Sequence, residues 1–265
     1  MKKGSPFIKS SIPFSPSRLD TTHFMLAWFR KRIGNGRTII DIGSGGTFLP
    51  WLLSTLDKKL DYLGVDIDPK KSAVKADKIK IKIVKKDILQ FNSSRKFDIA
   101  ACLWTLEHIR NHQSACKKIF GLLNKEGFAV IAVPSIWSWP IEFGRHGYRY
   151  YSKSQITKLV QSAGFWIDEF YEAGGLSGLL FMLFYSWPRY LVLLPLSIIY
   201  LSLKFFGVAQ NSWKEFSHKA VSTLFYSYHG SKKGVLFHNV IVSKIVALDN
   251  KLKIFPASYV LILKK

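Results

Sequence analysis

The chain has 265 residues, enough for one large domain or a domain with an appendage, and its 48% hydrophobic and 15% aromatic content excludes a disordered protein. Its 39 Lys and Arg residues against 17 Asp and Glu residues give a formal net charge of +22. Such an excess attracts polyanions, so the candidate partners are nucleic acid and an anionic membrane surface.

The amino-terminal region, residues 1–37, is expected to form an extended basic arm followed by one helix. Three prolines interrupt the first 18 residues, and no long apolar stretch indicates a secretory signal. Apolar residues at helical spacing predict a helix over residues 20–33, with Ser17 and Asp20 as a capping box. Two glycines follow this stretch and are expected to end the helix.

A strand, a glycine-rich turn and a helix are expected in residues 38–53, T-I-I-D-I-G-S-G-G-T-F-L-P-W-L-L. Glycine lets a backbone approach a ligand closely and adopt positive φ, and ligands of such sheets lie beyond the carboxyl ends of the strands. A dinucleotide fingerprint would carry its acid about 20 residues further on. The turn therefore predicts a nucleotide site of another kind, formed by Asp41, Gly43, Ser44, Gly45 and Gly46, and a purely structural turn is the alternative.

The next two predicted strands, residues 60–65 and 79–84, are each followed by an acidic residue. Asp66, in G-V-D-I-D-P, can hydrogen-bond both hydroxyls of a ribose through its two carboxylate oxygens. The alternative role, a helix N-cap before the following proline, suits Asp68 better. Asp87 is expected on the loop after the third strand, where the alternative is a solvated acid without a ligand.

Residues 97–103, F-D-I-A-A-C-L, are apolar enough for a central parallel strand that is covered on both faces. They lead into W-T-L-E-H-I, in which Glu107 and His108 are expected to open a helix that runs over residues 111–123. Capping and packing are alternatives to a catalytic role for these two residues. A fifth strand is predicted over residues 127–133.

An aromatic and polar loop, residues 137–151, leaves the carboxyl end of the fifth strand. Loops at this end of a parallel sheet hold substrates, so this loop is the expected substrate site. A helix capped by Ser152 and a strand over residues 165–171 are predicted to follow. The candidate substrate-binding residues of the loop are Trp137, Trp139, Glu142, Arg145, His146, Tyr148, Arg149, Tyr150 and Tyr151.

A long apolar run over residues 176–203 contains a single charge, Arg189. Its length suggests a membrane segment, but W-P-R-Y at residues 187–190 divides it into halves too short to span a core of ~30 Å. Two short helices that dip into one leaflet are therefore expected, and a soluble lid or a dimer face is the alternative. Further helices are predicted over residues 214–228 and 235–248.

Several of these segments resemble, in order and spacing, the class I S-adenosylmethionine (SAM)-dependent methyltransferases of the small-molecule and lipid type. They are D-x-G-x-G-G, G-V-D, F-D followed by L-E-H, and L-L-N-K-E-G-F-A-V-I-A-V-P. One departure is Thr47, where the family usually has glycine. The resemblance implies an α/β, doubly wound, Rossmann-like sheet of seven strands. Its last strand, residues 257–263, would run antiparallel between the fifth and sixth.

The resemblance also implies SAM as the cofactor and roles for individual residues. The glycine turn would hold SAM, Asp66 would bind its ribose, and Ile67 would lie beside the adenine. Asp87 would bind the adenine amino group, and Ile88 would pack on the ring. The wall beside the transferred methyl group would consist of Cys102, Leu103 and Trp104.

The expected organisation has an arm and helix in residues 1–37, a SAM-binding core in 38–173, a hydrophobic and basic helical insertion in 174–256, and a final core strand in 257–265. Because the last strand must return to the sheet, the insertion cannot cross a membrane an odd number of times. We expect a peripheral, monotopic or re-entrant hairpin association with the cytoplasmic side of a membrane. The two cysteines lack metal-ligand spacing, so a reduced setting and no metal site are expected.

The leading hypothesis is a SAM-dependent methyltransferase that acts on a lipid-like or lipid-linked small molecule at the membrane surface. A hydroxyl acceptor would need a general base, for which His146 is the first candidate and His108 the second. Nucleic-acid methylation is an alternative prompted by the net charge, but C-L-W-T-L-E-H replaces the Asn/Asp-Pro-Pro-aromatic motif of base-amino methyltransferases, so nucleic acid is not the expected partner. A non-catalytic, membrane-associated SAM-binding protein is a further alternative, supported by Thr47. The oligomeric state is not predicted.

Overall fold

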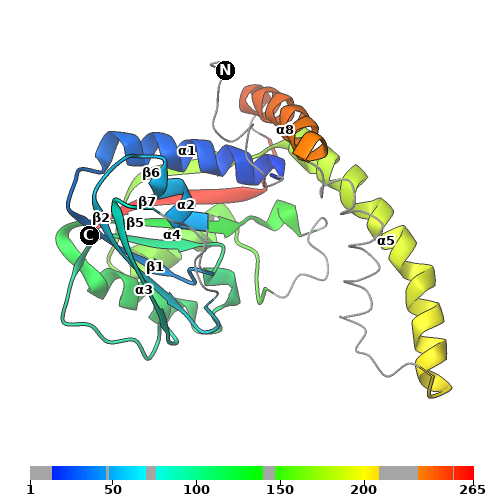
Figure 1. Ribbon diagram of the computed structural model, residues 1–265, viewed down its shortest axis with the longest axis horizontal. Coiled ribbons are helices and arrows are strands. Elements are labelled where there is room, and N and C mark those ends of the chain that lie inside the picture. The colour runs from blue at the N-terminus through cyan, green and yellow to red at the C-terminus, as the bar shows by residue number, and fades with distance from the viewer. Residues whose placement is uncertain (1–13, 46–47, 70–75, 140–146, 209–231, 253) are drawn as a thin grey trace. The chain divides into compact units, whose positions relative to one another are not determined.

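The computed structural model describes residues 14–45, 48–69, 76–139, 147–208, 232–252 and 254–265 (Figure 1). The chain divides into two compact units. Residues 20–173 and 256–265 form the sheet unit, which holds every strand described. Residues 1–19 and 174–255 belong to the second, the helical unit.

Seven strands form one sheet in the order β3-β2-β1-β4-β5-β7-β6 (Figure 1). Strands β1 to β5 pair in parallel, whereas β7 runs antiparallel to both β5 and β6. This confirms the expected Rossmann-like α/β fold with its antiparallel last strand. The strands are Arg37–Ile42 (β1), Leu60–Asp66 (β2), Ile79–Lys85 (β3), Phe97–Leu103 (β4), Leu123–Pro134 (β5), Trp166–Ala173 (β6) and Ser258–Lys264 (β7).

The burial of the strands follows their sequences. In the central strand β4, every residue except Asp98 and Leu103 is buried, as its continuous apolar sequence predicts. The edge strand β3 alternates exposed lysines with partly buried isoleucines, which discourages pairing with other chains. Strand β5 begins at Leu123, four residues earlier than expected, because N-K-E-G continues the strand, and Leu123 pairs with Phe97 ahead of an irregularity in the register.

Helices cover both faces of the sheet (Figure 1). Residues on one face of β5, such as Ala129 and Ile131, share a core with buried residues of α3 and α4. Phe128 points to the other face because side chains alternate along a strand, and its ring centroid lies 5.5 Å from that of Trp28 in α1. The helices of this region are α1 (Pro16–Arg32), α2 (Phe48–Ser54), α3 (His112–Leu122) and α4 (Lys153–Ser162), with short 3-10 helices η1 (Leu106–His108) and η2 (Ile136–Ser138).

The predicted start of the first helix is wrong. Helix α1 begins at Pro16, and the side chain of Ser15 accepts a hydrogen bond of 3.4 Å from the N–H of Arg18. Proline suits the first position of a helix because no N–H is needed there. Asp20, expected in the capping box, instead accepts a hydrogen bond of 2.7 Å from the hydroxyl of Tyr171. By contrast, Ser152 forms the predicted cap, as a reciprocal capping box with Gln155 at the start of α4.

The helical unit contains helix α5 (Leu176–Phe205) and helix α8 (Lys232–Leu252). The expected break at residues 187–190 is wrong, because the backbone continues as one helix of 30 residues. A proline removes one N–H and bends many helices, but it need not end them. The helix predicted over residues 235–248 is confirmed as part of α8, and the one over 214–228 lies outside the described residues. No helix in the described part of the chain is long and apolar enough to cross a membrane.

A buried carboxylate joins α8 to the first turn of α5. Asp249, 2% exposed, accepts hydrogen bonds from the N–H groups of Gly175 (3.1 Å), Ser177 (2.7 Å) and Gly178 (2.7 Å). These are N–H groups that a helix leaves without intrahelical partners, and the helix dipole favours a negative charge there. A Cβ at position 178 would lie 2.8 Å from Oδ2 of Asp249, so glycine is required for this close approach.

Replacement of Gly178 by alanine is expected to destabilise the protein by about 1–3 kcal/mol, because the added methyl group must displace Asp249 or Pro16. Gly121 is the matched control, since it also lies in a helix but has no atom within 4 Å of a built Cβ. Gly121→Ala should be neutral or stabilise by up to about 1 kcal/mol. Urea unfolding followed by circular dichroism measures the stability of both variants. Equal midpoints would contradict a requirement for glycine at position 178 beside Asp249.

Candidate functional site

The glycine turn after β1 is shaped by its contact with the loop after β4. Gly43 and Gly45 have φ of 70° and 53°, a region that favours glycine. A Cβ at position 43 would lie 2.1 Å from Cγ2 of Thr105, whereas one at position 45 would meet nothing within 4 Å. Gly43 therefore allows the two loops to touch, and Gly45 leaves space above the turn. Gly46 lies outside the described residues.

Asp66, at the end of β2, is attached to the same turn. Its Oδ2 accepts a hydrogen bond of 2.8 Å from the N–H of Gly45, and its Oδ1 accepts one of 2.8 Å from the N–H of Asp68. Each carboxylate oxygen can accept more than one hydrogen bond, so both remain able to bind hydroxyl groups. Ile67 beside it is 69% exposed, which leaves an apolar surface next to the carboxylate.

Beneath the turn, Asp41 forms a buried pair with Tyr62. The tyrosine hydroxyl donates a hydrogen bond of 2.6 Å to Oδ2 of Asp41, which is 3% exposed. Burial raises the pKa of Asp41 from its ordinary value of 3.8 to about 7, against the lowering effect of the Tyr62 hydrogen bond, and the charge of Asp66 adds to the rise. Ser44 packs over Gly64, where a Cβ would lie 2.7 Å from its Oγ. Sequence reasoning missed Tyr62, because the pairing depends on the register of β1 and β2.

The third acidic residue, Asp87, lies in a turn after β3. Its Oδ1 accepts a hydrogen bond of 2.8 Å from the N–H of Leu89. Ile88, expected to pack on an adenine ring, is only 5% exposed and belongs to the core of the sheet unit. Leu89 is 36% exposed and is the more accessible apolar neighbour. The roles assigned to Asp87 and Ile88 toward a nucleotide stay predictions.

The loop after β4 contains a strained residue. Leu103 ends the strand partly buried, and Trp104 follows with φ of 49°, unusual for any residue except glycine. The N–H of Trp104 donates to the carbonyl of Ala132 (2.8 Å), and its ring meets that of Phe48 edge to face at 5.9 Å. Sequence reasoning missed Thr105, whose hydroxyl is within donating distance of the carbonyls of Gly43 (3.3 Å) and Leu103 (3.2 Å). The aromatic ring and the glycine turn therefore meet at one edge of the sheet.

Of the two candidate bases, only His108 is described. It lies in η1 with its side chain 49% exposed, and its Nε2 is 3.8 Å from Oε1 of the buried Glu107. The predicted helix start at these two residues is wrong, because α3 begins at His112 and Asn111 caps it through Ser114. His146 lies outside the described residues.

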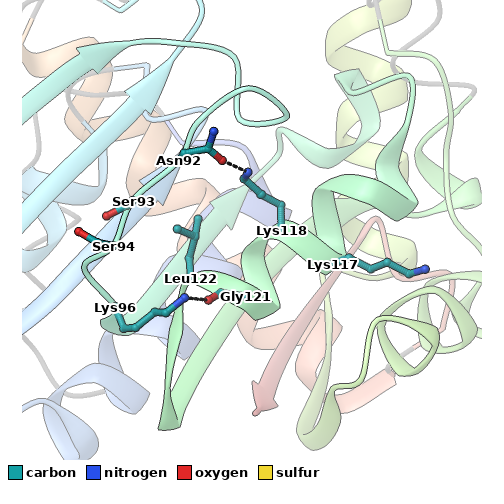
Figure 2. A pocket seen from close by; sticks show the side chains of 8 residues that line it. All are labelled: Asn92, Ser93, Ser94, Lys96, Lys117, Lys118, Gly121 and Leu122. Carbon is teal, nitrogen blue, oxygen red and sulfur yellow. Dashed lines mark hydrogen bonds between the residues drawn. The ribbon is translucent and has the colours of Figure 1, made fainter.

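A separate cavity of about 540 Å³ lies near the amino end of β4, whereas the glycine turn lies at the carboxyl ends of the strands. Figure 2 shows Lys118 directed toward Oδ1 of Asn92 and Lys96 toward the carbonyl of Gly121, each at 2.7 Å. Gly121 is in the last turn of α3, where the helix dipole favours a positive charge. Lys96 therefore stabilises the end of α3, and the cavity is separate from the candidate site.

Residues 18–169, more than half of the chain, match the family described as a methyltransferase domain. The chain therefore belongs to this family of methyltransferase domains. The residues present fit the cofactor, because an open glycine turn, a carboxylate with free acceptor capacity and an exposed apolar side chain meet at the carboxyl edge of the sheet.

Individual similarities are more distant. The ubiquinone biosynthesis O-methyltransferase of Rickettsia felis is 25% identical over 97 residues, which cover 36% of this chain and 40% of that protein. A putative sarcosine dimethylglycine methyltransferase from Galdieria sulphuraria has 13% identity and a TM-score of 0.53, covering 96% of this chain and 91% of its own. The [4+2]-cyclase SpnF has 15% identity and a TM-score of 0.52, covering 94% and 81%. These structures share the fold, and a fold alone does not define the acceptor.

The Asp41–Tyr62 pair predicts how stability depends on pH. Because the folded-state pKa of Asp41 lies near 7, above its ordinary 3.8, the folded protein holds a proton that the unfolded chain releases. Stability contributed by this proton is complete below about pH 4 and is lost as the pH rises toward 7, with a slope approaching about 1.4 kcal/mol per pH unit. Asp41→Asn keeps an acceptor for Tyr62 and should flatten this decline.

Urea unfolding of the cofactor-free protein at pH 5, 6, 7 and 8 measures the difference in slope. Asp57→Asn is the matched control, since Asp57 is exposed and its hydrogen bond with Lys78 lowers its pKa, so it does not titrate in this window. Parallel pH profiles for wild type and Asp41→Asn would show that Asp41 is ionised in the folded protein.

Proposed function

We propose that this methyltransferase transfers the methyl group of SAM to a lipid-like or lipid-linked small molecule at the cytoplasmic side of a membrane. The observation that carries the proposal is a stripe of exposed apolar side chains along α5. Each is between 60% and 85% exposed, and their spacing of three, four or seven residues puts them on one side of the helix. The stripe consists of Phe184, Leu191, Leu194, Ile198, Leu201 and Phe205.

The charges around this stripe support an anionic membrane as its partner. No acidic residue occurs between Glu172 and Glu215, whereas Lys204 lies in the last turn of α5. Monomeric soluble proteins rarely expose so large an apolar surface, and lysines that flank an apolar helix favour anionic lipid. A lipid acceptor would then be present in the layer that α5 contacts.

In the proposed reaction, bound SAM supplies a methyl group that is already activated for transfer. The glycine turn and Asp66 would hold its amino acid and ribose parts, and Ile67 would cover the adenine. Trp104 would border the methyl group and exclude water from it. An O-methyltransferase among the relatives supports a hydroxyl acceptor, whose proton would pass to His146 or, as second candidate, His108.

The substrate proposal is tested with membranes from cells that produce the protein, incubated with methyl-labelled SAM. We expect label in the organic phase after extraction, and label confined to the aqueous phase would contradict a lipid acceptor.

Asp66→Ala should lower SAM affinity at least about tenfold, because hydrogen bonds to a charged group contribute about 1.5–3 kcal/mol each. Calorimetry that gives equal affinities for a folded variant would remove Asp66 from the cofactor site.

Membrane binding by α5 is tested by flotation with vesicles of phosphatidylcholine and phosphatidylglycerol. The wild type should float in 1 M salt, because apolar burial contributes roughly 25 cal/mol per Å² and is not screened. The double substitution Leu194→Glu and Ile198→Glu should abolish flotation, whereas Trp166→Glu, at a residue of β6 that is 73% exposed, should not. A double variant that floats normally but changes from dimer to monomer would instead identify the stripe as a dimer face.

A further inference from the structure

Tyr148 and Arg149, near the end of the expected acceptor loop, are hydrogen-bonded to the segment that follows Trp104. Arg149 donates from Nη1 to the carbonyl of Ile109 (2.8 Å) and from Nη2 to the carbonyl of Arg110 (2.9 Å). The N–H of Tyr148 donates to the carbonyl of Glu107 (2.9 Å). Three hydrogen bonds therefore connect two loops that come from different strands of the sheet.

The base of the same loop is closed by Tyr151. Its N–H donates to the carbonyl of Pro134 (3.1 Å), and its carbonyl accepts from the N–H of Ile136 (3.0 Å), so the two ends of the loop pair with each other. The Tyr151 hydroxyl lies 2.9 Å from Nδ1 of His112, and the side chain is 2% exposed. The loop thus starts and ends at fixed positions, and Arg149 fixes its final residues against the chain after β4.

Arginine is suited to this connection and lysine is not. A guanidinium presents donors on two nitrogens in one rigid plane, so it can bind two successive carbonyls at the same time. Lysine has a single nitrogen on a flexible chain. The positive charge also strengthens both bonds relative to those of a neutral donor. Arg149 was expected to contact the acceptor, but the structure uses its guanidinium to bind the backbone at Ile109 and Arg110.

We propose that Arg149 is a positioning residue for methyl transfer. It holds residues 147–151, at the end of the proposed acceptor loop, in register with the loop after β4, so that an acceptor bound beside them lies in line with a methyl group bordered by Trp104. This rests on the proposed role of residues 137–151 as the acceptor loop. A displacement of about 1 Å between reacting groups can cost on the order of 100-fold in rate, so the connection affects turnover although Arg149 touches neither substrate.

The test compares Arg149→Gln, Arg149→Lys and a matched control, Arg110→Gln. The control removes the same charge from an exposed neighbour whose backbone carbonyl, not its side chain, takes part in the connection. Transfer of label from SAM to an extract of producing cells is measured with the organic and aqueous phases counted separately. SAM affinity by calorimetry and the melting temperature are measured on the same samples.

We expect Arg149→Gln to lower the initial rate of label transfer at saturating SAM on the order of 10- to 100-fold with SAM affinity within about twofold of wild type, Arg149→Lys to be intermediate, and Arg110→Gln to match wild type. Equal turnover for Arg149→Gln and Arg110→Gln would overturn the proposal. So would parallel losses of turnover, SAM affinity and melting temperature, which indicate a general structural role. Label in the aqueous phase alone would contradict the lipid acceptor, while the comparison among the variants would still decide the role of Arg149.

Discussion

The close contact between Gly43 and Thr105 determines how the loops of the candidate site meet. Strands β1 and β4 are adjacent and parallel, so the loops that follow them begin side by side at the carboxyl ends of the strands. Because a Cβ at position 43 would overlap the threonine side chain, only glycine permits this distance between the loops. The hydrogen bond from Gly45 to Asp66 then attaches the end of β2 to the same turn. Three segments that are separate in the sequence become one site through the order of the strands.

Two features of this site are unfavourable when considered alone. Asp41 places a carboxyl group in a buried position that disfavours its charged form, and Trp104 adopts a positive φ that costs on the order of 1–3 kcal/mol. Both are held by the surrounding sheet, Asp41 through the hydroxyl of Tyr62 and Trp104 through the carbonyl of Ala132. Such local costs concentrate at binding and catalytic sites, which agrees with the position of both residues at the carboxyl edge of the sheet.

The helical unit has a different physical basis from the sheet unit. Helix α5 exposes much of its apolar surface, so its first turn depends on polar contacts, and Asp249 supplies three of them from α8. Phe14 is bound to α8 as well. The side chain of Asn239 accepts a hydrogen bond from the N–H of Phe14, and Nε2 of His238 bonds the carbonyl of Phe14. The apolar stripe is therefore carried by a unit with its own internal connections, and its composition agrees with the proposed contact with lipid.

Much of the sheet unit was predictable from the sequence, because the information is local. Continuous apolar runs such as residues 97–103 identify buried parallel strands, and Ser152 identifies a helix start. The nucleotide site expected at the glycine turn stays a prediction. The antiparallel place of the last strand came from family resemblance, not from the pattern of residues 257–263 alone. The start of α1 was missed because several nearby residues could cap it, and the cap seen, Ser15, precedes a proline.

Only the tertiary structure decided the contacts between residues far apart in the chain. Tyr62 reaches Asp41 because the register of β1 and β2 places them together, and Arg149 reaches Ile109 and Arg110 because two loops converge at one edge of the sheet. Asp249 binds the start of α5 across more than 70 residues. For most of the sheet unit, the sequence by itself determined which segments are strands, helices and turns, because periodicity and turn chemistry act over a few residues. The partners of individual polar side chains depend on which segments pack together, and that is determined by the burial of the whole sheet.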